Sequence, residues 1–229
     1  AYYNESGIMK RDKNQSWDSS LKVDRFNMRS NVDMNLTPTT LVQFNIGGYL
    51  QKRISPPQSI DDLFNSAFST PPFVHPTIYE NGKIPRRNNR ENPWALATQT
   101  GYERRAQSKL ESTFAVEQDL KVITPGLKAK GVFSFDYYSA NWVKRTKNPI
   151  YYQPAAGRDS ETGELILGDG SIGQEFLGHE KDSDWGNNSM YLETSLNYDR
   201  TFDDHNLNAM LLYNQRDYDE GQNLPFRRQ

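Results

Sequence analysis

Residues 25–36, RFNMRSNVDMNL, alternate between apolar and polar side chains almost without interruption. Successive side chains of a β-strand point to opposite faces of a sheet, so this pattern predicts one strand with an apolar and a polar face. The apolar face carries Phe26, Met28, Val32, Met34 and Leu36, and the polar face carries Arg25, Asn27, Arg29, Asn31 and Asp33. A soluble sheet buries its apolar face in a core, whereas a membrane barrel turns that face to lipid and the polar face to a wet lumen.

Five further segments alternate in the same way, and the six segments together form three hairpins. The predicted strands cover residues 22–36, 41–52, 102–120, 127–139, 189–200 and 207–218. Short connections at 37–40, 121–126 and 201–206 join them in pairs, and Pro125–Gly126 is a strong turn dipeptide. These strands are longer than the ~5–6 residues usual in soluble sheets and are long enough for the ~9–11 residues of a tilted membrane span.

The connections between the hairpins are long, at residues 51–101 and 140–188, and are rich in Pro, Gly, Asn and charged residues. Within the first, SIDDLFNSAF (59–68) predicts a short helix with Ser59 as its N-cap. Short and long connections alternate, so an up-and-down sheet would place all short turns at one rim and all long loops at the other. That asymmetry is typical of outer-membrane barrels, and such long loops are unusual in soluble domains. We therefore predict an all-β fold: residues 1–229 are part of an antiparallel up-and-down transmembrane β-barrel with long extracellular loops.

Composition argues against several other classes of protein. No apolar run reaches the ~20 residues of a membrane helix, and a net charge of −2 gives no reason to expect a nucleic-acid partner. The absence of cysteine excludes disulfides, thiolate metal sites and cysteine nucleophiles within these residues. The mean hydropathy of −0.87 is low, but regular alternation and an aromatic content of 12% argue against disorder.

No catalytic or metal-binding pattern is evident, so we expect neither enzymatic activity nor a cofactor. His75, His179 and His205 are far apart in sequence, and none has a partner at a metal-ligand spacing. The segment DSD (182–184) lacks the twelve-residue calcium-loop pattern, and a calcium site there would need a third donor from elsewhere. Calcium binding by the long loops therefore stays open at this stage.

The long loops contain candidate residues for contacting a substrate. Aromatic side chains beside cations can stack on sugar rings or grip a peptide, although long loops also need aromatics for their own packing. The candidates are Trp94, Trp142, Tyr151, Tyr152 and Trp185, with Arg86, Arg87, Arg90 and Arg158. The residues predicted to face the lumen are Arg25, Asn27, Arg29, Asn31, Asp33, Lys109 and Glu111.

Several segments together carry a family resemblance. They are DDLFNSAFSTPPFVHP, Asn92–Pro93 followed by Ala95–Leu96, Thr100–Gly101–Tyr102 and VEQDL before the ITPGL turn. In combination they resemble the barrel of SusC/RagA-type TonB-dependent outer-membrane transporters, and the terminal LLYNQRDYDEGQNLPFRRQ is similar to a later strand and loop of that barrel. The resemblance extends from about residue 20 onward and is weakest in the middle of the second long loop.

The resemblance implies a plugged barrel of ~22 strands that imports oligosaccharides or peptides across a Gram-negative outer membrane. Besides the lipid bilayer, it implies two partners: TonB, and a SusD-like surface lipoprotein that covers the barrel. Six strands cannot close such a barrel, and no plug, TonB-contacting segment or signal peptide is visible, so we expect the chain to be part of a transporter. The alternatives are a soluble β-rich carbohydrate-binding module and a non-transporting structural or adhesin barrel.

Overall fold

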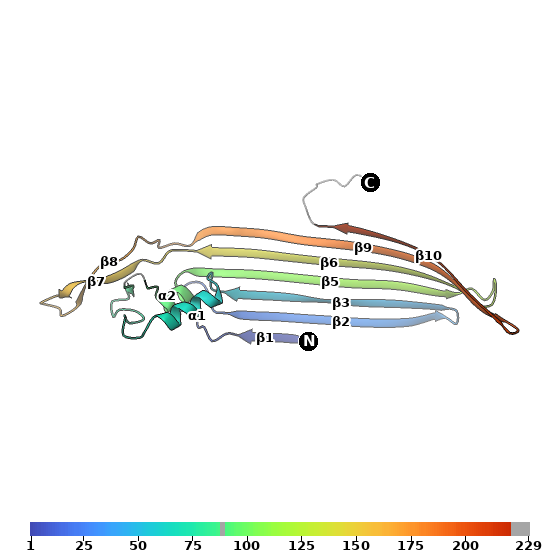
Figure 1. Cartoon of the computed structure of the whole chain (residues 1–229), viewed down its shortest axis with the longest axis horizontal. Coiled ribbons are helices and arrows are strands. Elements are labelled where there is room, and N and C mark those ends of the chain that lie inside the picture. Colours follow the sequence, from blue (N-terminus) through green and yellow to red (C-terminus); the bar gives the residue numbers. More distant parts are fainter. Residues whose placement is uncertain (88–89, 221–229) are drawn as a thin grey trace.

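The computed structural model describes residues 1–87 and 90–220, with the backbone alone for Ala156 and 180–182. Its main feature is one antiparallel sheet of seven strands (Figure 1). In spatial order these are β1 (Tyr2–Ser6), β2 (Lys22–Thr37), β3 (Thr40–Ser55), β5 (Gly101–Asp119), β6 (Leu127–Thr146), β9 (Gly178–Phe202) and β10 (His205–Asp219). Strands make up 60% of the described residues and helices 7%, which confirms the predicted all-β class, and the sheet is open rather than closed into a barrel.

The three predicted hairpins are present as the pairs β2–β3, β5–β6 and β9–β10. The prediction is wrong about the lengths of two strands, because β6 continues to Thr146 and β9 already begins at Gly178. Beyond the apolar stretch, the two faces of these strands no longer differ as apolar and polar, so the alternation disappears although β6 and β9 remain paired. The short polar strand β1, which pairs with residues 22–26 of β2, is missing from the prediction for the same reason.

The short turns and the long connections lie at opposite ends of the sheet (Figure 1), as predicted from their alternation in sequence. We call these the turn end and the loop end. The long connections, 56–100 and 147–177, are shorter than predicted because strand residues replace their ends. They contain α1 (Ile60–Ser69), α2 (Pro93–Thr98) and a small sheet of β4 (Ile84–Pro85), β7 (Tyr151–Arg158) and β8 (Leu165–Asp169).

An N-cap side chain fixes the start of each of the two helices. Ser59 Oγ accepts a hydrogen bond from the backbone N–H of Asp62 at 3.1 Å, which confirms the predicted start of α1. Asn92, which is only 1% exposed, caps α2 by accepting from the N–H groups of Trp94 and Ala95 at 3.1 and 3.3 Å. Its amide nitrogen donates to the carbonyls of Thr77 and Pro85 at 2.9 and 3.3 Å. This one side chain therefore ties α2 to the loop that precedes it.

The β5–β6 turn is fixed by a glycine against the neighbouring strand. Gly126 has φ +86°, and its carbonyl accepts a hydrogen bond from the N–H of Asp199 on β9 at 2.9 Å. A Cβ atom at this position would lie 2.0 Å from the carbonyl oxygen of Asp199. Only glycine therefore fits this turn without movement of β9.

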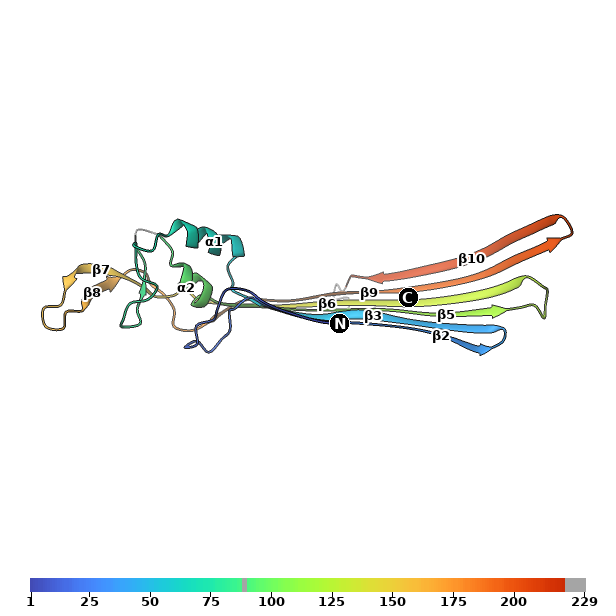
Figure 2. The same ribbon diagram turned by 90° about the horizontal axis from the view of Figure 1, so that it is seen from below.

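The main sheet is a single layer over most of its length. Figure 2 shows β2 to β10 nearly edge-on, with the helices gathered at the loop end. Buried apolar side chains are correspondingly few among the described residues, namely Val42, Leu63, Ala95, Ala115 and Tyr151. The part of the chain that the structure describes thus has no layered core of the kind expected for a soluble sandwich.

Candidate functional site

One face of the main sheet carries a continuous apolar band, because strand register aligns the apolar positions of six strands. Val32, Phe44, Phe114, Phe133 and Leu192, for example, lie in one row across β2, β3, β5, β6 and β9. The other members are Phe26, Met28, Met34 and Leu36 of β2, Val42, Ile46 and Leu50 of β3, Leu110 and Val116 of β5, Leu127, Phe135 and Tyr137 of β6, Met190, Leu196 and Tyr198 of β9, and Leu207, Leu211 and Tyr213 of β10.

This band is open to solvent in the structure, with Phe26 49%, Leu50 60% and Leu211 71% exposed. Soluble monomers rarely expose an apolar patch of this extent. On β2 the band extends from Phe26 to Leu36 and on β6 from Leu127 to Tyr137, close to the ~9–11 residues of a tilted membrane strand. On β2, β3, β5 and β6, no charged side chain shares this face between the band's limits. On the last two strands Arg200, opposite Leu207, and Asp217, opposite Met190, lie on it.

The opposite face of the same strands is polar and charged. All seven residues predicted to face a lumen lie on it: Arg25, Asn27, Arg29, Asn31, Asp33, Lys109 and Glu111. Lys109 forms an ion pair with Glu111, and Lys128 Nζ lies 3.2 Å from Glu117 Oε1. The two faces of one sheet thus differ in charge along the whole height of the band.

Toward the loop end this polar face becomes aromatic. Trp142 and Trp185 were predicted to lie in a loop, which is wrong, because they belong to β6 and β9. Strand register places Trp185 in one row with Ala140, Gln107, Gln51 and Arg25. The next row toward the loops contains Trp142, Arg105 and Arg53.

Cations and neighbouring rings contact the aromatic residues of this region. The guanidinium of Arg25 lies 4.1 Å from the ring centroid of Tyr49, and that of Arg105 lies 4.5 Å from Trp142. Trp185, which is 54% exposed, packs edge-on against Tyr138 with centroids 5.1 Å apart. We call Arg25, Tyr49, Arg105, Tyr138, Trp142 and Trp185 the wall patch. Its position across five adjacent strands makes it roughly 20 Å wide at the usual strand spacing.

The wall patch is not predicted from the sequence, although the strand pattern contains a signal for part of it. Continuing the parity of β6 past residue 139 places Tyr138 and Trp142 on the same face as Asp136, which is the polar face. The apolar alternation ends there, so the prediction ends the strand there. Tyr49 and Arg105 have no such signal, because their importance depends on partners from other strands.

Several candidates in the long loops are used for packing. Tyr151, which is 5% exposed, lies beneath Arg86, whose guanidinium is 5.4 Å from the ring and whose Nη2 is 3.5 Å from Glu91 Oε1. Burial raises the pKa of Tyr151 to about 12, Glu91 adds to that effect and Arg86 opposes it. Arg90 donates to the backbone carbonyl of Ser69 and forms an isolated β-bridge with Arg87. Tyr151 therefore has no free ring face to offer a ligand.

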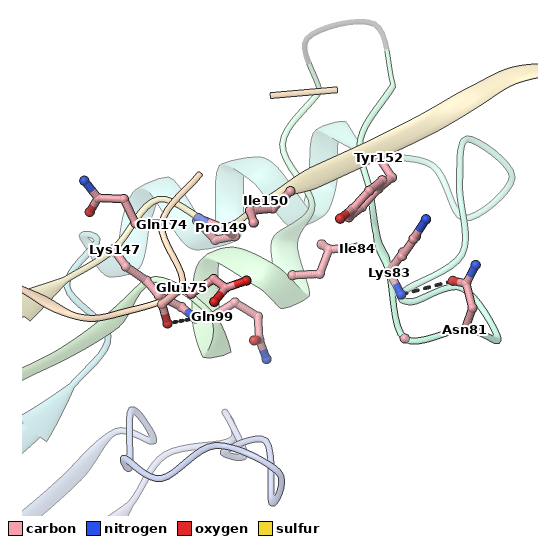
Figure 3. Close-up of a pocket in the computed structure, with 11 residues that line it drawn as sticks. Asn81, Lys83, Ile84, Gln99, Lys147, Pro149, Ile150, Tyr152, Gln174 and Glu175 are labelled. Carbon is pink, nitrogen blue, oxygen red and sulfur yellow. Dashed lines mark hydrogen bonds between the residues drawn. The ribbon is translucent and has the colours of Figure 1, made fainter. Parts of the chain in front are cut away.

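Hollows lie among the loops, and two of them place cations beside candidate tyrosines. Figure 3 shows the smaller of these two, of about 280 Å³, into which Tyr152, Lys147 and Glu175 project. Lys83 Nζ lies 4.5 Å from the ring centroid of Tyr152 and covers that ring. The larger, of about 710 Å³, is lined mainly by polar groups, including Arg86, Lys144 and Lys147. Trp94, at the start of α2, is half-buried and lines neither hollow.

Within the described residues, no group of three or more His, Cys, Asp or Glu side chains is placed to hold a metal ion. The three histidines belong to separate elements, His75 to the first long connection, His179 to β9 and His205 to β10. None of the helices in the described ranges is long and apolar enough to cross a membrane. No family model and no curated protein matches this chain.

Proposed function

We propose that the chain forms part of the barrel wall of a SusC/RagA-type TonB-dependent transporter in a Gram-negative outer membrane. The observation that carries this proposal is the apolar band, which is uncharged on β2, β3, β5 and β6, whose height suits a membrane span and whose opposite face is charged. In a barrel the band contacts lipid, and the polar face contacts water or a plug. A soluble carbohydrate-binding module would leave the whole band in water, which is costly at ~25 cal/mol per Å² of apolar surface.

Lipid also requires every backbone polar group in the band to be paired within the protein. Strands β3, β5, β6 and β9 have neighbours on both sides in this structure. Strand β10 has one neighbour, and β1 pairs only with residues 22–26 of β2. The proposal therefore places further barrel strands beside β2 and β10, in keeping with the ~22 strands of large transporters.

The wall patch suits the entrance of a substrate path, because it lies between the long loops and the apolar band. Trp185 offers an exposed ring to a sugar. Arg25 already donates to Asn27 and Arg105 to Glu103, and each guanidinium has further N–H groups that could donate to hydroxyl or carboxylate groups. In the proposed mechanism, an oligosaccharide or peptide binds under a SusD-like lipoprotein at the loop end. TonB then pulls on a plug, which opens the path along the polar face.

Single-cysteine labelling tests the orientation of the sheet, and the chain contains no cysteine to interfere. Cysteines replace Met28, Val32 and Leu110 on the apolar face, or Asn27, Asn31 and Glu111 on the polar face, of the full-length protein in outer-membrane vesicles. We expect a lipid-dissolved reagent to modify only the first set and an aqueous maleimide to favour the second. Equal labelling of both sets would contradict the barrel proposal.

Substrate uptake tests the role of the wall patch and separates a transporter from an adhesin barrel. We expect Trp185→Ala to reduce uptake of labelled oligosaccharides by roughly two- to tenfold, since one aromatic contact contributes ~0.5–1.5 kcal/mol. Trp185→Phe keeps a ring and should restore most of the uptake at equal protein levels. Uptake that does not require TonB, or that is the same in all three proteins, argues against this role. Parallel assays with labelled peptides identify the substrate class.

A further inference from the structure

The apolar band contains a groove close to its loop-end limit. The groove has a volume of about 170 Å³ and is lined by Phe26, Met28, Leu50, Ser108, Leu110 and Tyr137 of four adjacent strands. The groove is deepest over Gly48 and Ser108, which lie on neighbouring strands between larger apolar side chains. Gly48 has no side chain and that of Ser108 is small. A Cβ atom at Gly48 would lie 2.1 Å from the carbonyl oxygen of Lys109, so the backbone itself keeps this position free of a side chain.

Directly beyond the groove, toward the loops, the same face of the sheet becomes polar. Ala106 follows Ser108 on this face, with Lys52 beside it on β3 and Asn141 beside it on β6. Arg104 is the next residue along this face of β5. Lys52 and Arg104 are diagonal neighbours across β3 and β5, so their Cβ atoms are ~7–8 Å apart.

Both cations are exposed, and among the described residues neither forms an ion pair. Arg104 lies over the ring of Tyr102 at 5.1 Å. Two carboxylates lie nearby, one strand further out on each side. Asp24 accepts hydrogen bonds from Tyr2 and Asn4 at 2.9 and 2.5 Å, and Asp184 accepts from Asn141. The centre of the arrangement, over the small side chain of Ala106, is therefore flanked by two positive charges.

We propose that this surface binds one phosphate-bearing lipid of the leaflet at the loop end. An acyl chain lies in the groove over Gly48 and Ser108, and the phosphate lies over Ala106, where Lys52 and Arg104 donate to its oxygens. The inference rests on the proposed function, because only a sheet embedded in a bilayer presents this groove to lipid. Charge complementarity selects an anionic lipid over a zwitterionic one, since each cation near such a headgroup contributes ~1 kcal/mol.

The test uses the full-length protein in detergent, titrated with a hexa-acylated diglucosamine bisphosphate and followed by native mass spectrometry. We expect the double variant Lys52→Gln/Arg104→Gln to weaken the binding about thirtyfold, as the loss of two such contacts implies. Ala106→Phe keeps both charges but fills the phosphate position, and it should weaken binding as well. Arg200→Gln is the matched control, because Arg200 shares this face but lies at the opposite, turn-end limit of the band, directly beside Leu207.

Wild-type affinity in the double variant would overturn the lipid site, as would equal affinity for phosphatidylcholine or competition by inorganic phosphate alone. The cysteine labelling described above is repeated on the same double variant. Normal labelling by face together with unchanged lipid affinity removes the lipid site and leaves the barrel proposal intact. If the wild-type protein itself shows equal labelling of the two faces, both the barrel proposal and the lipid site are refuted.

Discussion

Replacing Phe133 by lysine is expected to prevent most of the protein from folding into the outer membrane. Phe133 lies in the middle row of the apolar band, with Phe114 and Leu192 beside it on β5 and β9. A lysine near the centre of a bilayer costs ~2–4 kcal/mol on the lipid face of a barrel. That cost is a large fraction of the total stability of most proteins, which is ~5–15 kcal/mol. The amount of folded protein in isolated outer membranes measures the effect.

Ser134→Lys is the matched control, because it introduces the same charge one residue later on the same strand. Ser134 lies on the polar face, where its hydroxyl is 3.1 Å from that of Thr113. We expect this variant to reach the membrane at nearly normal levels. If Phe133→Lys is equally well tolerated, or makes the protein more soluble without detergent, the apolar band does not contact lipid.

Replacing Gly126 by alanine is expected to cause the second large loss of stability. Alanine at φ +86° costs ~1–3 kcal/mol for the backbone conformation alone. In addition, its Cβ would lie 2.0 Å from the carbonyl oxygen of Asp199, so the β5–β6 turn has to move away from β9. Equilibrium unfolding in urea, with the protein in lipid vesicles, should show a lower midpoint.

Gly131→Ala provides the comparison for the same substitution on strand β6. A Cβ atom at Gly131 meets nothing within 4 Å, and its backbone has no positive φ. We expect unchanged or slightly higher stability, because alanine restricts the unfolded chain by ~0.4–1 kcal/mol relative to glycine. Equal midpoints for the two variants would show that the β5–β6 turn tolerates a side chain.

The sequence predicts those parts of the fold in which the two faces of a strand, or a strand and its turn, have different residue types. The hairpins, the separation of turns from loops and the position of α1 follow from alternation, turn residues and the Ser59 cap. Alternation fails where the two faces of a strand do not differ as apolar and polar, and for this reason the outer parts of β6 and β9 are mistaken for loop. The parallel pair β4–β7 has no local signal at all, because its two strands come from different long connections.

The candidate site is predicted less well than the fold. The polar-face residues such as Arg29 and Asp33 are placed correctly because parity alone determines their side of the strand. Whether an aromatic side chain is buried in packing or exposed to a ligand depends instead on tertiary contacts. Tyr151 and Trp185 look alike in sequence, yet one is buried beneath Arg86 and the other is exposed on a strand. Residue type and loop composition cannot distinguish these two environments.

The unusual length of β6 and β9 has a consequence for the position of the long connections. Beyond Tyr137, the last residue of the apolar band on β6, this strand remains paired with β9 to Thr146. At ~3.3 Å per residue, that extension separates the helices and the β4–β7–β8 sheet from the apolar band by roughly 20–30 Å. If the band lies in a bilayer, as proposed, a polymer approaching from outside meets these loops well before it reaches the lipid surface.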